Sequence, residues 1–194
     1  EFRVVTMTLA LAGSGIVVAA AMFLAAAAVA GAGSLDVIDF PSSRDLAPVG
    51  LVSVAWISLM YMFLYGQSAA VFYTYKNTRA KGESKRLVEG KDGEAAPPSF
   101  AAIKYRGKGS RINLAASRTV GNMIEQALPF LLSLWMHAIF VSPDNAAVAG
   151  WVWLGFRAIY PLVFLKGLPW LLISTVPGYA VVLYLVGGVI VKMA

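Results

Sequence analysis

The sequence contains no cysteine and a single histidine, His137, and only 13% of its 194 residues are charged. The absence of cysteine excludes disulfides, thiolate metal sites, c-type haem attachment and a cysteine nucleophile. One histidine cannot build a multi-histidine zinc or di-iron centre, so no metal site is predicted. A soluble domain has about a quarter of its residues charged. The shortage here, with 59% hydrophobic residues and a mean hydropathy of +0.71, indicates that lipid surrounds much of the chain.

Five apolar stretches are long enough to cross a hydrocarbon core of about 30 Å, which takes about 20 helical residues. The stretches are continuous rather than alternating, and a helix satisfies its backbone groups within its own segment, so helices are favoured over barrel strands. The sequence therefore predicts an all-α integral membrane protein. The stretches cover residues 4–30, 49–75, 112–141, 146–165 and 170–191.

The first stretch has two interpretations. Its alanine-rich end, residues 25–33, is similar to the small-residue end of a signal or thylakoid-type transfer sequence. Its small residues would equally let a spanning helix pack closely against another helix. We expect a spanning helix in residues 1–34, although the start at Glu1 rather than methionine also fits a processed, organelle-imported chain. A short acidic loop is expected over 35–48, where Pro41 and Pro48 argue against a long helix.

The segment 76–111 is predicted to be a basic loop. It holds ten Lys and Arg residues against four acidic ones, and its charge of +6 equals that of the whole chain. The positive-inside rule places it on the cytoplasmic, stromal or matrix side, with the kind of membrane left open. A solvated loop that sets the topology is favoured over a nucleic-acid site, and no nucleic-acid partner is predicted. The remaining alternative is attraction of anionic lipid or of an acidic partner.

Polar side chains mark the first half of the stretch 112–141. Arg118, Asn122 and Glu125 are spaced by four and three residues and therefore share one helix face. A carboxylate inside a membrane requires a partner, and the candidates for Glu125 are Arg118, Arg157 of the next stretch, or groups of another subunit. Two interpretations stay open: a site for an anionic ligand, and a structural network that fixes the helix register.

Arg157, Tyr160 and His137 complete the set of polar candidates. The guanidinium of Arg157 stays charged and must pair, either as an anion clamp or as the structural partner of Glu125. His137 lies about 18 Å along its helix from Glu125. A polar helix end is its expected role, and a haem, chlorophyll or other pigment ligand is the alternative.

These residues resemble a pattern of the MAPEG family, the membrane-associated proteins in eicosanoid and glutathione metabolism. That pattern, Arg-x-x-x-Asn-x-x-Glu followed by a Pro-Phe-Leu-like run, is matched by Arg118, Asn122 and Glu125 and then by residues 129–131. The family's Gly-Arg-x-x-Tyr pattern in the next helix is similar to residues 155–160, with one residue inserted. The resemblance covers about residues 50–194 and leaves the first stretch as an N-terminal extension.

The resemblance implies a MAPEG-like four-helix domain over 49–194, commonly a homotrimer. Glutathione would bind between subunits near the cytoplasmic side, and lipophilic substrates would enter from the membrane lipid. The residues that it assigns to glutathione are Arg118, Asn122, Glu125, Arg157 and Tyr160.

The sequence departs from the family at the start of the last helix, where an arginine stabilises the glutathione thiolate by its positive charge. Residues 166–177 contain no arginine. A glutathione-dependent transferase or peroxidase would then form its thiolate beside Ser174, Tyr160 or Lys166. The alternative is a non-catalytic accessory subunit of a larger respiratory or photosynthetic membrane complex, the latter with bound pigment.

Overall fold

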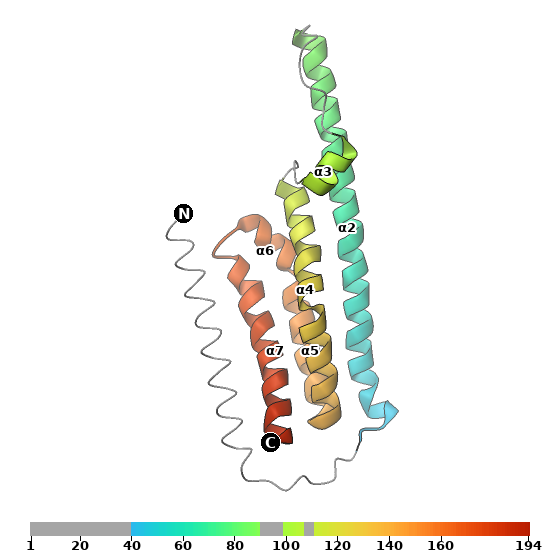
Figure 1. Ribbon diagram of the computed structural model, residues 1–194, viewed down its shortest axis with the longest axis vertical. Helices are drawn as coiled ribbons and strands as arrows, with labels where there is room; N and C mark the ends of the chain where they lie inside the picture. The colour runs from blue at the N-terminus through green and yellow to red at the C-terminus, as the bar shows by residue number, and fades with distance from the viewer. Residues whose placement is uncertain (1–39, 90–98, 107–110) are drawn as a thin grey trace. The chain divides into compact units, whose positions relative to one another are not determined.

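The computed structural model describes residues 40–89, 99–106 and 111–194, and these residues form helices and no strand (Figure 1). The fold class predicted from the sequence is confirmed. The spanning segment predicted for residues 1–34, and the acidic loop before residue 40, lie outside the described residues. The helices are α2 (Ser43–Glu89), α3 (Phe100–Arg106), α4 (Arg111–Phe140), α5 (Pro143–Ala158), α6 (Tyr160–Lys166) and α7 (Leu171–Met193).

Three of the described helices are long and apolar enough to cross a membrane: α2 over Ser43–Ala80, α4, and α7. Helices α5 and α6 pass the same test only when taken together, and counting this pair, bent by 40° at its junction, as one span gives a fourth. The bend has a local cause, because Pro161 has no amide N–H to bond the carbonyl of Arg157 and its ring crowds that carbonyl. These four spans match the predicted stretches 49–75, 112–141, 146–165 and 170–191.

Helix α2 begins at Ser43, earlier than the predicted residue 49. A capping arrangement accounts for the early start. The Ser42 hydroxyl accepts a hydrogen bond from the Asp45 amide, and the Ser42 amide donates one to the Asp45 carboxylate at 3.0 Å. Pro48 therefore does not exclude a helix, because a proline this near the start removes only one intrahelical hydrogen bond. The loop predicted up to residue 48 is thus shorter.

Helix α2 also continues to Glu89, through the first part of the segment 76–111 that was predicted as a loop. Residues 76–89 are rich in Lys, Arg and Glu, which favour a helix in water. Hydropathy marks where a membrane span ends, and a helix can extend beyond that point. A further helix, α3, occupies Phe100–Arg106. Residues 90–98 and 107–110 of the predicted loop lie outside the described residues.

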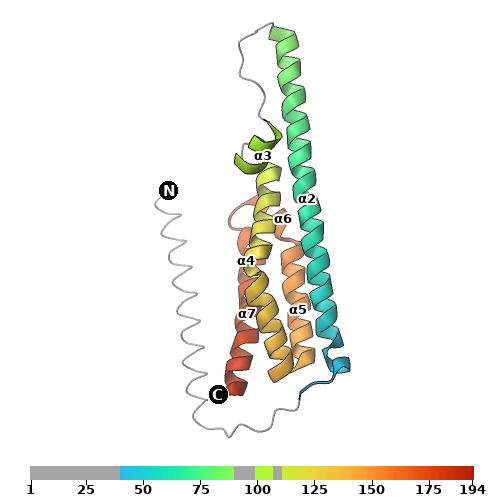
Figure 2. The ribbon, with the colours of Figure 1, turned by 45° about the vertical axis from the view of Figure 1, so that its right-hand side comes forward.

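The chain divides into two compact units, which we describe separately. The first comprises Glu1–Ser53, Pro129–Trp153 and Val176–Ala194, and the second comprises Val54–Leu128 and Leu154–Thr175. In the first unit, the rings of Phe130 and Trp153 stack with centroids 3.9 Å apart. The second unit contains α3, which lies across the start of α4 beside α2 in both views (Figures 1 and 2).

Candidate functional site

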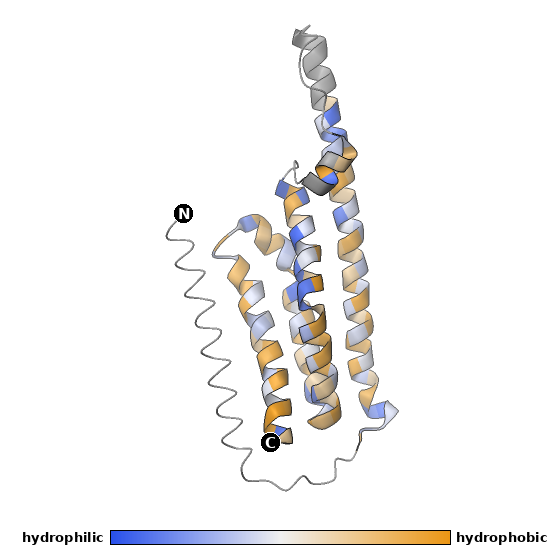
Figure 3. Ribbon diagram, in the orientation of Figure 1, coloured by the Kyte–Doolittle hydropathy of each residue, from blue (hydrophilic) through white to orange (hydrophobic). Residues whose placement is uncertain are grey.

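The first half of α4, in the second unit, is the most polar part of the four spans. Figure 3 shows hydrophilic residues recurring along this half of α4, whereas hydrophobic residues dominate α7. Arg118, Asn122 and Glu125 follow one another at the spacing of neighbouring turns. The prediction that α4 carries these three side chains on one face is consistent with their position around a single pocket.

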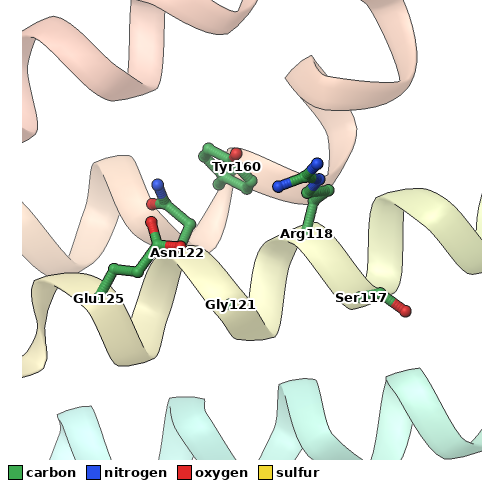
Figure 4. Close-up of a pocket in the computed structure, with 6 residues that line it drawn as sticks. All are labelled: Ser117, Arg118, Gly121, Asn122, Glu125 and Tyr160. Atoms are coloured by element: carbon green, nitrogen blue, oxygen red, sulfur yellow. The ribbon is translucent and has the colours of Figure 1, made fainter. Parts of the chain in front are cut away.

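That pocket has a volume of about 310 Å³ and combines α4 with the first residue of α6 (Figure 4). Figure 4 shows Tyr160 close to Arg118 and Asn122, while the hydroxyl of Ser117 is turned away from them. Two lining residues, Ser117 and Gly121, were missed by the sequence interpretation. Gly121 is four residues from both Ser117 and Glu125, and this helical spacing could have revealed the two residues. The pocket is lined by Ser117, Arg118, Gly121, Asn122, Glu125 and Tyr160.

Arg157 lies in the last turn of α5 and is only 1% exposed. Its Nη1 donates a hydrogen bond to Oδ1 of Asn122. Sequence reasoning had offered Glu125 as its partner, but the guanidinium is placed behind Asn122 and does not line the pocket. The predicted and observed partners of Arg157 differ because packing determines which side of α5 faces α4. The spacing of residues within α5 does not reveal that side.

The bond from Arg157 determines how the Asn122 amide is oriented. A guanidinium has donors and no acceptor, so the atom of Asn122 that it contacts must be the oxygen. The two N–H groups of the amide are then left on the other side, where Asn122 lines the pocket. Asn122 therefore presents a hydrogen-bond donor to a ligand, and the buried positive charge of Arg157 reinforces that polarity.

The pocket has a positive end and a negative end. Arg118 and Glu125 are both exposed, and neither forms an ion pair with another described residue. They are seven residues apart on α4, which corresponds to roughly 10 Å along the helix axis. The amide of Asn122 and the ring of Tyr160 lie between them. This arrangement is complementary to an extended zwitterion whose carboxylate and ammonium groups are separated by about the same distance.

The sequence model of the MAPEG family matches residues 10–191 of the 194-residue chain. The chain belongs to the MAPEG family. The matched region starts well before residue 50, where the resemblance drawn from the motifs began, and so includes most of the first apolar stretch. No curated protein sequence and no solved structure matches the chain.

The start of α7, where this MAPEG chain lacks the arginine, offers no replacement in the pocket. Ser174 is fully buried, and its Oγ donates to the carbonyl of Phe156 at 2.5 Å, so its proton is already engaged. Lys166 places its Nζ 4.7 Å from the ring centroid of Trp170. Of the three groups considered for thiolate formation, Tyr160 alone lines the pocket.

His137 is in the first unit and does not belong to this pocket. Its ring is 1% exposed, and its Nδ1 lies 3.0 Å from the carbonyl oxygen of Leu185. A Cβ on Gly188 would come within 2.5 Å of the imidazole, so this glycine allows α7 to approach α4. His137 thus joins α4 to α7. Its alternative role as a haem or pigment ligand stays a prediction.

The contact between Arg157 and Asn122 predicts which substitutions destabilise this MAPEG protein. Arg157→Met removes a charged hydrogen bond to a partly buried acceptor, so the free energy of unfolding should fall by about 2 kcal/mol. Arg118→Met changes an exposed side chain and should alter it by less than about 0.5 kcal/mol. Thermal unfolding of both variants in the same detergent measures the difference. Equal melting temperatures for the two variants would contradict the assigned contact.

Proposed function

We propose that the pocket on α4 binds a short peptide of the glutathione type, and that the protein is a glutathione-dependent transferase or peroxidase for lipophilic substrates. The observation that carries this proposal is the single pocket lined by Arg118, Asn122, Glu125 and Tyr160. Membership of the MAPEG family supports it.

The charges of the pocket support a peptide ligand over a single amino acid. Glutathione carries an ammonium group at one end and a carboxylate at the other, and an extended tripeptide spans roughly 10 Å. Its glycine carboxylate would pair with Arg118 and accept from the Asn122 amide, and its ammonium group would pair with Glu125. A single amino acid holds both charges too close together to reach both ends of the pocket.

The central position of Tyr160 supports thiol chemistry. A phenol hydroxyl that donates a hydrogen bond to sulfur favours the thiolate over the thiol. The thiol proton passes to water, the sulfur lone pair attacks an electrophilic carbon, and the leaving group departs with its electron pair as the S–C bond forms. In the peroxidase reaction, two glutathione thiols reduce a hydroperoxide to an alcohol and water and become one disulfide.

The surface beside the pocket supports a lipophilic second substrate. Ile124 and Leu128 flank Glu125 on α4, and their side chains are 56% and 73% exposed. In a membrane span, such apolar side chains contact lipid. A lipophilic electrophile dissolved in the bilayer would therefore reach the pocket along these residues without entering water. Arg118 and Glu125, which form no ion pair among the described residues, also fit a site completed by a neighbouring copy in a homotrimer.

A second candidate, a non-catalytic subunit of a larger membrane complex, is favoured by one observation. Ser174 and Lys166 are engaged by Phe156 and Trp170, so neither lines the pocket where a thiol would bind. Such a subunit would use the polar face of α4 for protein contacts. Glutathione binding without turnover, or no binding at all, would favour this role over the enzyme.

Asn122→Asp tests the binding mode. The new carboxylate should pair with Arg157 and keep the protein folded, but it replaces a donor by a negative charge facing the ligand carboxylate. We expect the affinity for glutathione to fall by at least about ten-fold, the equivalent of 1.4 kcal/mol. Titration calorimetry in detergent measures it, with the melting temperature as the control. Unchanged affinity in a folded variant would exclude the proposed orientation.

Tyr160→Phe tests the chemistry. The variant keeps the ring and loses only the hydroxyl, so glutathione affinity should change by less than about three-fold while kcat falls by about ten-fold or more. Because the lost hydroxyl favours the thiolate, the rate profile should shift to higher pH. Conjugation of chlorodinitrobenzene followed between pH 6 and 9, roughly the range in which thiols titrate, reports both effects. A proportional loss of affinity and rate, with no shift in pH profile, would assign Tyr160 a structural role only.

A further inference from the structure

The end of the second unit at which α4 begins carries a set of exposed cations that the pocket does not use. Lys76 and Arg79 lie on α2, Arg111 begins α4, and Lys166 ends α6, and all four side chains are exposed. They do not line the pocket around Glu125. We call these four residues the basic surface.

Contacts within the unit join the elements that carry the basic surface. Beside Lys76, Tyr75 meets Phe100 of α3 edge to face, with ring centroids 5.7 Å apart. Asn113 of α4 donates to the carbonyl of Ile103 in α3 at 3.3 Å. At the other side, Nη2 of Arg111 lies 3.8 Å from where a Cβ on Gly167 would stand, next to Lys166. The four cations therefore belong to one continuous surface.

The basic surface lies at the ends of membrane spans. Arg111 is the first residue of the α4 span and Lys166 is the last residue of the α5–α6 pair. Lys76 and Arg79 directly follow the apolar stretch 49–75 of α2. Side chains at span ends reach the lipid headgroups, and long basic side chains extend toward them. Cations at such positions are suited to contact the lipid phosphates.

Apolar side chains stand among these cations. Leu168 and Trp170 in the turn between α6 and α7 are 57% and 48% exposed, and Lys166 lies over the Trp170 ring. A tryptophan beside a cation at a span end is typical of the membrane interface. Among the side chains described in this unit, Glu125 is the only acidic one, and it is fourteen residues along α4 from Arg111, about 20 Å. No described carboxylate therefore neutralises the basic surface.

We infer that the basic surface binds the headgroups of anionic phospholipids. The ligand must be anionic where Arg111 and Lys166 reach it and must offer hydrocarbon where Leu168 and Trp170 are exposed. A phospholipid meets both requirements in one molecule, whereas an acidic peptide or a nucleic acid meets only the first. The site lies outside the α4 pocket and does not depend on the proposed reaction.

Native mass spectrometry of the full chain in detergent tests this inference, with phosphatidylglycerol and phosphatidylcholine added in equal amounts. The wild-type protein should retain phosphatidylglycerol in preference to phosphatidylcholine. The double variant R111Q/K166Q should lose affinity for phosphatidylglycerol by roughly five-fold per charge removed and keep its affinity for phosphatidylcholine. Raising the salt concentration before transfer should weaken the same preference.

The matched control is R44Q/K192Q, which removes the same charge from the other ends of the α2 and α7 helices, where both side chains are exposed. It should leave the lipid preference unchanged. Equal losses in the two double variants would assign the preference to net charge alone and overturn the inference. So would a wild-type protein that retains both lipids equally, or one that binds an acidic peptide and shows no lipid preference.

A second pair of substitutions covers the case in which R111Q/K166Q fails to fold. The variant K76Q/R79Q changes two exposed side chains on α2 that make no contact with α4 or α7 through their charged groups among the described residues. It should reduce the preference for phosphatidylglycerol by a similar factor. If it retains the full wild-type preference while melting at the wild-type temperature, the basic surface is not the lipid site.

Discussion

A guanidinium that is 1% exposed inside a membrane protein must be hydrogen-bonded, because a buried charge without acceptors costs several kcal/mol. In the second unit, the side-chain oxygen of Asn122 is one of its acceptors. This contact ties α4 to α5 and settles which atoms of the Asn122 amide remain for the pocket. The hydrogen-bond donor that Asn122 presents to the pocket is therefore set by a residue, Arg157, that does not line it.

The sequence predicted the parts of this arrangement that depend on local periodicity. Four spans follow from continuous hydropathy, and the face formed by Arg118, Asn122 and Glu125 follows from a spacing of four and three along α4. The family was also recognisable from these residues. Each of these features is determined within one helix, so the neighbours of that helix do not alter it.

The features that sequence reasoning missed depend on contacts between helices or on how far a helix continues beyond its membrane span. The partner of Arg157 depends on which side of α5 faces α4, and the engagement of Ser174 depends on how the last turn of α5 lies against α7. The extension of α2 to Glu89 was missed because a drop in hydropathy was equated with the end of a helix. The early start of α2 had a readable signal in the Ser42-x-x-Asp45 pattern.

The pocket and the basic surface both include residues of α4. The positive charges of both attract anions. Arg118 is about 10 Å along the helix from Arg111, close to the Debye length of roughly 10 Å at 0.1 M salt. A basic entrance raises the local concentration of anions, so a negatively charged peptide would be drawn toward the positive end of the pocket. Glu125, the one carboxylate that lines the pocket, would then attract the ammonium end of a zwitterion and so fix its orientation.

The most direct measurement is a calorimetric comparison of glutathione with N-acetylglutathione, which lacks the ammonium group, on the wild-type protein and on Glu125→Gln. If Glu125 holds the amino end of the ligand, acetylation should weaken binding to the wild type by about ten-fold, the equivalent of 1.4 kcal/mol, and should change little in the variant. Equal affinities of the wild type for the two peptides, or no affinity for either, would contradict the account.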